Sequence, residues 1–383
     1  MARPIVVYHD DYLKYNFGES HVLREERLLL AEMLMEDYGL IGPSEAVKAT
    51  PLPATYEDFA TVHDMKYLDA LKQLSANPTG SSIVHGLGIA DNPVFAGMFE
   101  ASAVQVGGTL RACEAVAKGE TDRAFNLGGG FHHAMPDKAA GFCLVNDIAV
   151  GLKHLLTKHD LKRVLYLDID VHHADGVEKV FEGDRRVLNI SLHEDGHYLF
   201  PGTGAVDDIG VGDGEGYTVN VPLPPYTGDV SYLHAFKEVV LPLAESFRPE
   251  VIFTQLGADA HFADPLAHLN LTTWAYEEIG KTLDDFSRQH CDGRWIGVTG
   301  GGYDIMLCPR IWTLLFSKMV GREVDNNLPA EWMEYCKITY ATVPENGLLR
   351  DAATGMEETS VSRSVAKVVE SVKQKTFGYH GLI

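Results

Sequence analysis

Short apolar, β-branched segments alternate with segments of helical periodicity along most of the chain, and this alternation restricts the fold more than any other feature. The predicted strands are residues 5–8, 123–127, 164–169, 187–192, 217–221, 251–255 and 295–299. The predicted helices are residues 23–38, 95–117, 146–158, 230–247, 272–289 and 310–319. Because a strand–helix–strand unit returns the chain to the sheet in the same direction, the pattern predicts an α/β fold with a central, mostly parallel sheet and helices on both faces.

No repeat, low-complexity block or long linker interrupts the 383 residues. Length alone suggests two or three domains, although single α/β domains often exceed that prior. Residues 357–375 are predicted to form a mostly polar helix that packs on or beside the rest of the chain. The sequence leaves the oligomeric state open.

Polar, glycine-rich segments follow four of the predicted strands. They are residues 128–133, 168–176, 257–261 and 300–303. In open α/β sheets, ligands and catalytic groups gather at the carboxyl ends of the strands. Four such segments at four strand ends therefore predict one shared site.

The second of these segments carries carboxylates and an imidazole at alternating positions: Asp168, Asp170 and His172. A carboxylate and an imidazole two positions apart suit a borderline metal ion, and Asp259, after its own strand, is the best candidate for a third ligand. Three protein ligands leave a coordination position open, which is typical of a catalytic site. The alternative is that the two aspartates cap the following helix and the histidine lies on the surface.

The first and last segments add groups that transfer protons or donate hydrogen bonds. His132 and His133 could form a proton-transfer pair, with Asp168 and Asp175 available to fix their tautomers; the alternatives are two further metal ligands or a solvated loop. Tyr303 follows three glycines, and its hydroxyl could polarise a carbonyl; the alternative is a glycine turn followed by a packed tyrosine.

The charge balance is acidic, with 54 Asp and Glu against 32 Lys and Arg and a net charge of −22. A groove for nucleic-acid phosphates needs the opposite sign, so we predict no direct nucleic-acid binding. The field would attract a basic peptide or an amine, although solubility alone also accounts for it.

Other sequence features bear on the compartment. The 5 cysteines are scattered and form no C-x-x-C pair, which favours a reducing compartment over disulfides or a thiolate zinc site. No apolar run reaches the roughly 18 residues that span a bilayer, and the N-terminal apolar run, residues 5–7, is too short for a secretory signal. We therefore predict a cytoplasmic protein without a membrane partner.

A set of motifs extends over nearly the whole chain. They are HDDYLKY at 9–15, RLLL at 27–30, GGGFHHA at 128–134, GFC at 141–143, ND at 146–147, DIDVHHADGV at 168–177, SLH at 191–193, FPGTG at 200–204, GAD at 257–259 and GGGY at 300–303. With these motifs the chain resembles the zinc-dependent histone deacetylases, and within them the prokaryotic acetoin utilization protein (AcuC) branch. The resemblance implies the arginase/deacetylase fold, with one domain over residues 1–383 built around a parallel sheet.

The resemblance also implies an activity: removal of acetyl groups from the ε-amine of lysine in acetylated proteins or peptides, by attack of metal-activated water. Carried over by position, Asp170, His172 and Asp259 would bind Zn²⁺. Two carboxylates and one imidazole also accept Fe²⁺.

The resemblance assigns catalytic roles as well. Tyr303 would polarise the acetyl carbonyl together with the metal. His133 would act as the general base toward the attacking water and then as the acid for the leaving amine, while His132 would tune the charge beside it. Asp168 would orient His132, and Asp175 would orient His133.

Substrate-binding residues follow from the same resemblance. The residues implied to line a narrow tunnel for the lysine stem are Gly141, Phe142, Phe200 and Leu266. Asp91 matches a carboxylate at the rim that holds the substrate backbone, and Arg27 matches an arginine in the channel below the metal.

Structural K⁺ (or Na⁺) ions are implied at two places. The ligands of the first would be Asp168, Asp170, His172, Ser191 and Leu192. The second would use carbonyls near Phe181, Asp184, Val187 and Tyr217.

Two segments depart from the family pattern. Residues 21–27, HVLREER, lack prolines that the branch usually carries, and residues 197–199, HYL, precede Phe200 at the expected tunnel rim.

Three other functions compete with lysine deacetylation. A deacetylase of acetylpolyamines or other small amines would favour an acidic residue at the gate, where this chain has Leu266. A binuclear manganese ureohydrolase needs a second carboxylate two residues after Asp259, where this chain has His261. A non-enzymatic acetyl-lysine binder would be expected to lose Tyr303, a histidine or a ligand, and all are present.

Overall fold

The computed structural model describes residues 2–344, 346–352 and 359–382. Its strands are β1 (Ile5–Val7), β2 (Val47–Ala49), β3 (Arg123–Asn126), β4 (Val164–Asp168), β5 (Val187–Glu194), β6 (Thr218–Leu223), β7 (Val251–Gln255) and β8 (Trp295–Val298). They form one 8-stranded sheet in the order β2-β1-β3-β8-β7-β4-β5-β6, and every neighbouring pair is parallel.

Both faces of the sheet are covered, and strands β1 and β3 to β8 are buried along their whole length. In β4, Leu165 and Leu167 face one hydrophobic core, whereas Val164 and Tyr166 face the other. A sheet with one solvated face would leave half of the strand residues in water, so the burial of both faces, polar residues such as Asn189 and Thr254 included, requires two helical layers.

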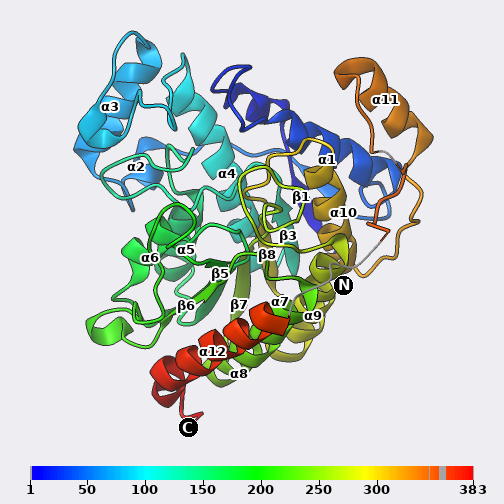
Figure 1. Ribbon diagram of the computed structural model, residues 1–383. Helices are drawn as coiled ribbons and strands as arrows, with labels where there is room; N and C mark the ends of the chain where they lie inside the picture. The colour runs from blue at the N-terminus through cyan, green and yellow to red at the C-terminus, as the bar shows by residue number, and fades with distance from the viewer. Residues whose placement is uncertain (1, 345, 353–358, 383) are drawn as a thin grey trace.

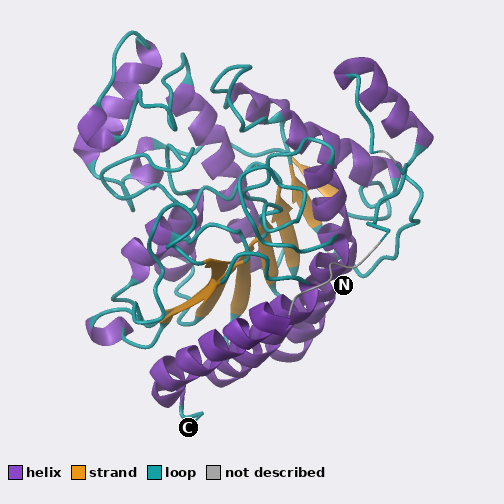
Figure 2. Cartoon of the chain, viewed as in Figure 1, coloured by secondary structure: helices purple, strands orange, loops and turns teal. Residues whose placement is uncertain are grey.

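One helical layer comprises α4 (Met98–Ala117), α5 (Asp147–Lys158) and α6 (Asp175–Phe181). The opposite layer comprises α1 (Glu26–Asp37), α7 (Asp229–Ala235), α8 (Leu241–Phe247), α9 (Thr273–His290), α10 (Leu307–Met319) and α12 (Thr359–Thr376). Figure 1 shows the two layers on either side of the strands, which Figure 2 colours separately. The remaining helices are α2 (Tyr56–Phe59), α3 (Met65–Ala76) and α11 (Ala330–Tyr340).

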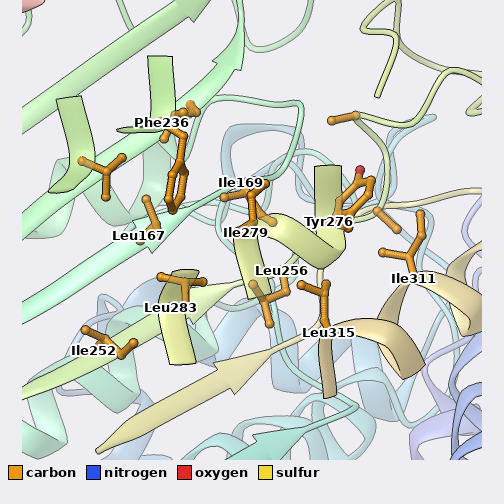
Figure 3. Packing of buried hydrophobic residues seen from close by; sticks show 14 of the residues in the cluster. Leu167, Ile169, Phe236, Ile252, Leu256, Tyr276, Ile279, Leu283, Ile311 and Leu315 are labelled. Carbon is orange, nitrogen blue, oxygen red and sulfur yellow. The ribbon is translucent and has the colours of Figure 1, made fainter. Parts of the chain in front are cut away.

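The larger core lies between the sheet and the second of these layers. Figure 3 shows residues in and just after β4 and β7 that contact helical residues there. The labelled residues are Leu167, Ile169, Ile252, Leu256, Phe236, Tyr276, Ile279, Leu283, Ile311 and Leu315. All of them are buried, which fixes α9 and α10 against β4 and β7.

Several elements differ from the expectation. The predicted helix 230–247 is α7 and α8 joined by a π-helical turn, Phe236–Val240. Strand β2 and helices α2, α3, α6 and α11 were not predicted; β2 has only 3 residues, too few to show a periodicity.

The C-terminal helix is not only a surface element. Residues 357 and 358 lie outside the described residues, and α12 occupies the rest of the predicted range. Val365, Val369 and Val372 are buried in the main core, whereas the opposite face is exposed. A mostly polar helix can pack against a core in this way when its apolar residues form a stripe along one face.

The strand order brings the four polar segments together. Strands β3, β8, β7 and β4 are consecutive in the sheet, and each runs directly into one of those segments. Since all strands are parallel, the four segments meet at one edge. Within the described ranges, none of the helices combines the length and the apolar character that a bilayer crossing requires.

Candidate active site

Three potential metal ligands converge at this edge. Asp170 and His172 follow β4, and Asp259 follows β7. The Nδ1 atom of His172 lies 3.1 Å from Asp170 Oδ1 and 3.1 Å from Asp259 Oδ2, and all three side chains are buried. Two carboxylates and one imidazole with their donor atoms turned toward a common point form a donor set that fits Zn²⁺ or Fe²⁺.

Hydrogen bonds from neighbouring groups orient the two carboxylates. Asp170 Oδ2 accepts bonds from Gln255 Nε2 at 2.6 Å and from the Gly301 amide at 2.7 Å. Asp259 Oδ1 accepts one from the Val171 amide at 2.9 Å. Sequence reasoning missed Gln255, although a polar residue at the end of an otherwise apolar strand is the signal that could have found it.

A glycine makes room for the two carboxylates. A Cβ atom on Gly301 would lie 1.9 Å from Asp259 Oδ2 and 2.8 Å from Asp170 Oδ2. Any side chain at this position would therefore displace the ligand oxygens, which explains why this strand end carries glycine.

His132 and His133 form a linked pair beside the ligands. His132 Nδ1 lies 2.8 Å from Asp168 Oδ2, and His133 Nδ1 lies 2.7 Å from Asp175 Oδ1. The two Nε2 atoms are 3.0 Å apart. The structure thus places each histidine beside the carboxylate that was predicted to orient it.

The two rings differ in their affinity for a proton. Burial disfavours the charged form of His132, but Asp168 and Asp170 outweigh it and raise the pKa of His132 to about 9. Burial together with the neighbouring His132 lowers the pKa of His133 to about 4. His133 is therefore the ring that is neutral at neutral pH and able to accept a proton.

A cavity of about 220 Å³ leads to these groups. Its lining residues are Asp91, His133, Gly141, Phe142, His172, Leu199, Phe200, Leu266 and Tyr303. The predicted tunnel and rim residues are all among them, and Leu199, from one of the departing segments, is an addition.

Tyr303 and Phe142 form part of the cavity wall. Their rings meet edge to face at 5.7 Å between centroids. The Tyr303 amide donates to Asp264 Oδ2 at 2.9 Å, and burial raises the pKa of the Tyr303 hydroxyl, which keeps it protonated as a donor. Asp264 is a further site residue that sequence reasoning missed.

The loop that carries Phe142 has an unusual backbone. Phe142 has φ of 67°, a left-handed conformation that a bulky residue adopts only when its surroundings impose it. The hydroxyl of Tyr15 donates to Phe142 O at 2.7 Å and accepts from the Leu144 amide at 3.0 Å, which holds the loop on both sides.

Arg27 lies on the inner side of the site. Its Nη1 donates to Gly300 O at 2.8 Å and Gly302 O at 2.7 Å, and its guanidinium stacks on Trp312 at 5.2 Å. It also lines a second cavity of about 30 Å³, together with His132 and Tyr303. Arg27 therefore fixes the glycine loop that precedes Tyr303.

The residues predicted for the two monovalent ions lie in two separate places. Asp168 and Ser191 are paired neighbours on β4 and β5, near Asp170. At the opposite ends of the strands, the carbonyls of Phe181 and Asp184 accept bonds from the amides of Asp184 and Val187. The Tyr217 carbonyl, close by on the chain that enters β6, bonds the Asn189 amide at 2.8 Å. Each carbonyl keeps a second lone pair, with which it could still bind a cation. The two ligand sets therefore remain predictions.

Sequence comparisons match most of the chain to one protein family. The model of the histone deacetylase domain matches residues 21–319. The acetoin utilization protein AcuC of Bacillus subtilis is 41% identical over 336 residues, covering 87% of this chain and 86% of that protein. The AcuC of Staphylococcus xylosus is 34% identical and covers 89% of each chain.

Solved structures show the same fold. A crystal structure of a histone deacetylase homologue in complex with SAHA has a TM-score of 0.86 at 32% identity and covers 97% of this chain and 100% of that one. A homologue from Aquifex aeolicus has a TM-score of 0.84 at 32% identity, covering 96% and 100%. The predicted arginase/deacetylase fold is thus confirmed.

Proposed function

The chain belongs to the histone deacetylase family, and from that premise we propose that it is a zinc-dependent deacetylase that releases acetate from the ε-amine of lysine in proteins or peptides. The observation that carries the proposal is the convergence of Asp170, His172 and Asp259 beside an apolar cavity whose lining includes His172, His133 and Tyr303.

The chemistry is shared between the ion and the side chains. When bound, a zinc ion supplies Lewis acidity, which lowers the pKa of a water molecule and polarises the acetyl carbonyl. Neutral His133 takes a proton from the attacking water and returns it to the leaving amine, so that lysine and acetate are the products. Asp175 stabilises the imidazolium that forms between these two steps.

Tyr303 and His132 act on charge. The Tyr303 hydroxyl donates a hydrogen bond to the carbonyl oxygen as negative charge develops there, which each such donor can stabilise by roughly 3 kcal/mol. His132, paired with Asp168, keeps a positive charge beside His133 and so lowers the proton affinity of that base.

The cavity favours a peptidyl substrate over an acetylpolyamine. Phe142 and Phe200 present apolar surface to the alkyl stem, whose charge the acetyl group has removed. Leu266 offers no carboxylate to a distal ammonium, whereas the Asp91 carboxylate at the rim can accept hydrogen bonds from the backbone amides of a peptide. Acetylpolyamines are therefore expected to be the poorer substrates.

The metal ligands provide the first test. Asp170→Ala and His172→Ala each remove one of three ligands, so both variants should lose most bound metal and nearly all turnover of an acetyl-lysine peptide. Metal content by plasma mass spectrometry and acetate release are measured on the same samples. Normal metal content and rate in either variant would place the site elsewhere.

Substrate class is tested by kcat/KM on a peptide, a minimal acetyl-lysine analogue and acetylspermidine. Asp91→Ala should lower kcat/KM most for the peptide, because only the peptide loses hydrogen bonds from its backbone amides to the Asp91 carboxylate. Each such hydrogen bond is worth about 1.5–3 kcal/mol. Leu266→Glu should improve acetylspermidine, since the new carboxylate gains a cationic partner. A wild type that prefers acetylspermidine would replace the lysine proposal by the small-amine one.

A further inference from the structure

A second group of metal-ligating side chains lies away from the catalytic edge. Glu114 is on α4, His154 is on α5, and His159 immediately follows α5. Glu114 Oε1 lies 2.6 Å from His154 Nε2 and 3.1 Å from His159 Nε2. The three candidate ligand atoms all lie within 4.8 Å of one another, and the two imidazole rings are 5.2 Å apart between centroids.

The donor types and spacing suit a transition metal. Two imidazoles and one carboxylate are a common ligand set for zinc. Around a zinc ion with ligand distances of about 2.1 Å, tetrahedral donors lie about 3.4 Å apart. The observed distances from Glu114 Oε1, 2.6 and 3.1 Å, approach that spacing, so small side-chain shifts would admit an ion.

The charges also permit an ion. Burial opposes ionisation of Glu114, but its bonds to Lys118, His154 and His159 outweigh this effect and lower the pKa of the carboxyl to about 2. Glu114 is therefore ionised and need not lose a proton to bind a cation. Lys118, which pairs with the other oxygen, is 66% exposed and can turn away into water.

The position separates this group from the reaction. Asp147, the first residue of α5, bonds the Gly130 amide next to the catalytic histidines, and the helix then runs away from that edge toward His154 and His159. Helices α4 and α5 pack side by side on one face of the sheet. An ion here would join the carboxyl-terminal ends of the two helices.

We propose that Glu114, His154 and His159 form a second site for a divalent transition metal of the zinc class, which ties α4 to α5 and takes no part in deacetylation. Water completes the coordination, since the three side chains are only partly buried. The proposal does not depend on the catalytic one.

The test is metal stoichiometry. The full chain is equilibrated with Zn²⁺ alone, freed of loose metal by gel filtration and analysed for zinc per chain. Wild type should hold two ions, His154→Gln/His159→Gln should hold one, and the exposed-histidine control His234→Gln should hold two. The double variant should keep wild-type turnover. On adding Zn²⁺, the catalytic-ligand variant Asp170→Ala should still show a rise in Tm, which comes from the second site, and this rise should be absent when Asp170→Ala is combined with His154→Gln/His159→Gln.

The outcomes are distinguishable. If Asp170→Ala holds one zinc ion per chain fewer than wild type and His154→Gln/His159→Gln holds as many as wild type, the proposed second site is wrong while the catalytic proposal stands. If the histidine variant alone lowers it, the second site stands and the catalytic centre must be reassigned. A double variant that holds two ions per chain also overturns the inference.

Discussion

At the scale of single residues, His132 and His133 are adjacent in the chain but differ in their affinity for a proton. His133→Ala should keep its metal and lose about 10²–10⁴-fold in rate, because it removes general acid–base catalysis. His132→Ala should lose less, since it only removes a charge beside the base. Single-turnover rates with metal analysis measure both, and a dead His132 variant beside a near-normal His133 variant would reverse the two roles.

Glu25 is a buried carboxyl without a hydrogen-bond partner among the described residues, and it is 4% exposed. Burial raises its pKa to about 7, although Arg27 opposes the shift. The folded protein therefore favours the protonated form. The protonated Glu25 side chain therefore contributes to the stability of the folded state. This contribution is complete below the pKa of the unfolded chain, near 4.5, and is lost as the pH rises through about 7.

The free energy of unfolding of Glu25→Gln, compared with that of wild type, should consequently be higher at pH 8 than at pH 5. The gain should be about 3 kcal/mol at most. The free energy of unfolding in urea at the two pH values measures it. The neighbouring Glu26 provides the control: despite partial burial, Arg24 lowers its pKa, so Glu26→Gln should bring no gain at pH 8. An equal gain in both variants would contradict the explanation.

The sequence was sufficient to predict the potential metal ligands and the two histidine–aspartate pairs, but not the residues that hold Asp170 and the backbone of Tyr303 in place. Asp170 and Asp259 follow strands, so the parallel sheet places them together once the fold class is known. Gln255 and Asp264 act through hydrogen bonds whose partners, Asp170 and the Tyr303 amide, lie far away in the sequence. No local pattern encodes such a pairing.

At the scale of secondary-structure elements, α12 tests how a mostly polar helix is held. Val369→Ala should destabilise the protein by about 1–3 kcal/mol, because it opens a cavity against the main core. Lys367→Ala, on the exposed face, should change stability by less than about 0.5 kcal/mol. The free energy of unfolding in urea is measured for both variants. Equal losses of stability would mean that the buried valines do not hold α12 against the core.

Elements were predictable where their packing shows in their own periodicity. The strand Val251–Gln255 was predicted with its observed bounds, because a short β-branched run between turns has few alternatives. The edge strand Val47–Ala49 was not predicted, since its pairing with β1 defines it and its residues do not. The π-helical turn after α7 places Phe236, Val239 and Val240 in the main core.

At the scale of the whole molecule, the net charge of −22 should act on substrate association. A cationic acetyl-lysine peptide should lose at least about threefold in kcat/KM when NaCl rises from about 0.02 M to about 0.3 M, because salt screens long-range attraction. A neutral peptide with the same acetyl-lysine should change little. Equal salt dependence of the two peptides would mean that the charge serves solubility alone.

The place of β8 in the sheet has a consequence for biosynthesis. Trp295–Val298 is the last strand to leave the ribosome, yet it pairs with β3 on one side and β7 on the other. Until it emerges, β2-β1-β3 and β7-β4-β5-β6 have no strand to join them. A nascent chain that stops before residue 295 therefore exposes two unpaired inner edges, and nascent-chain holdases have reason to bind it there.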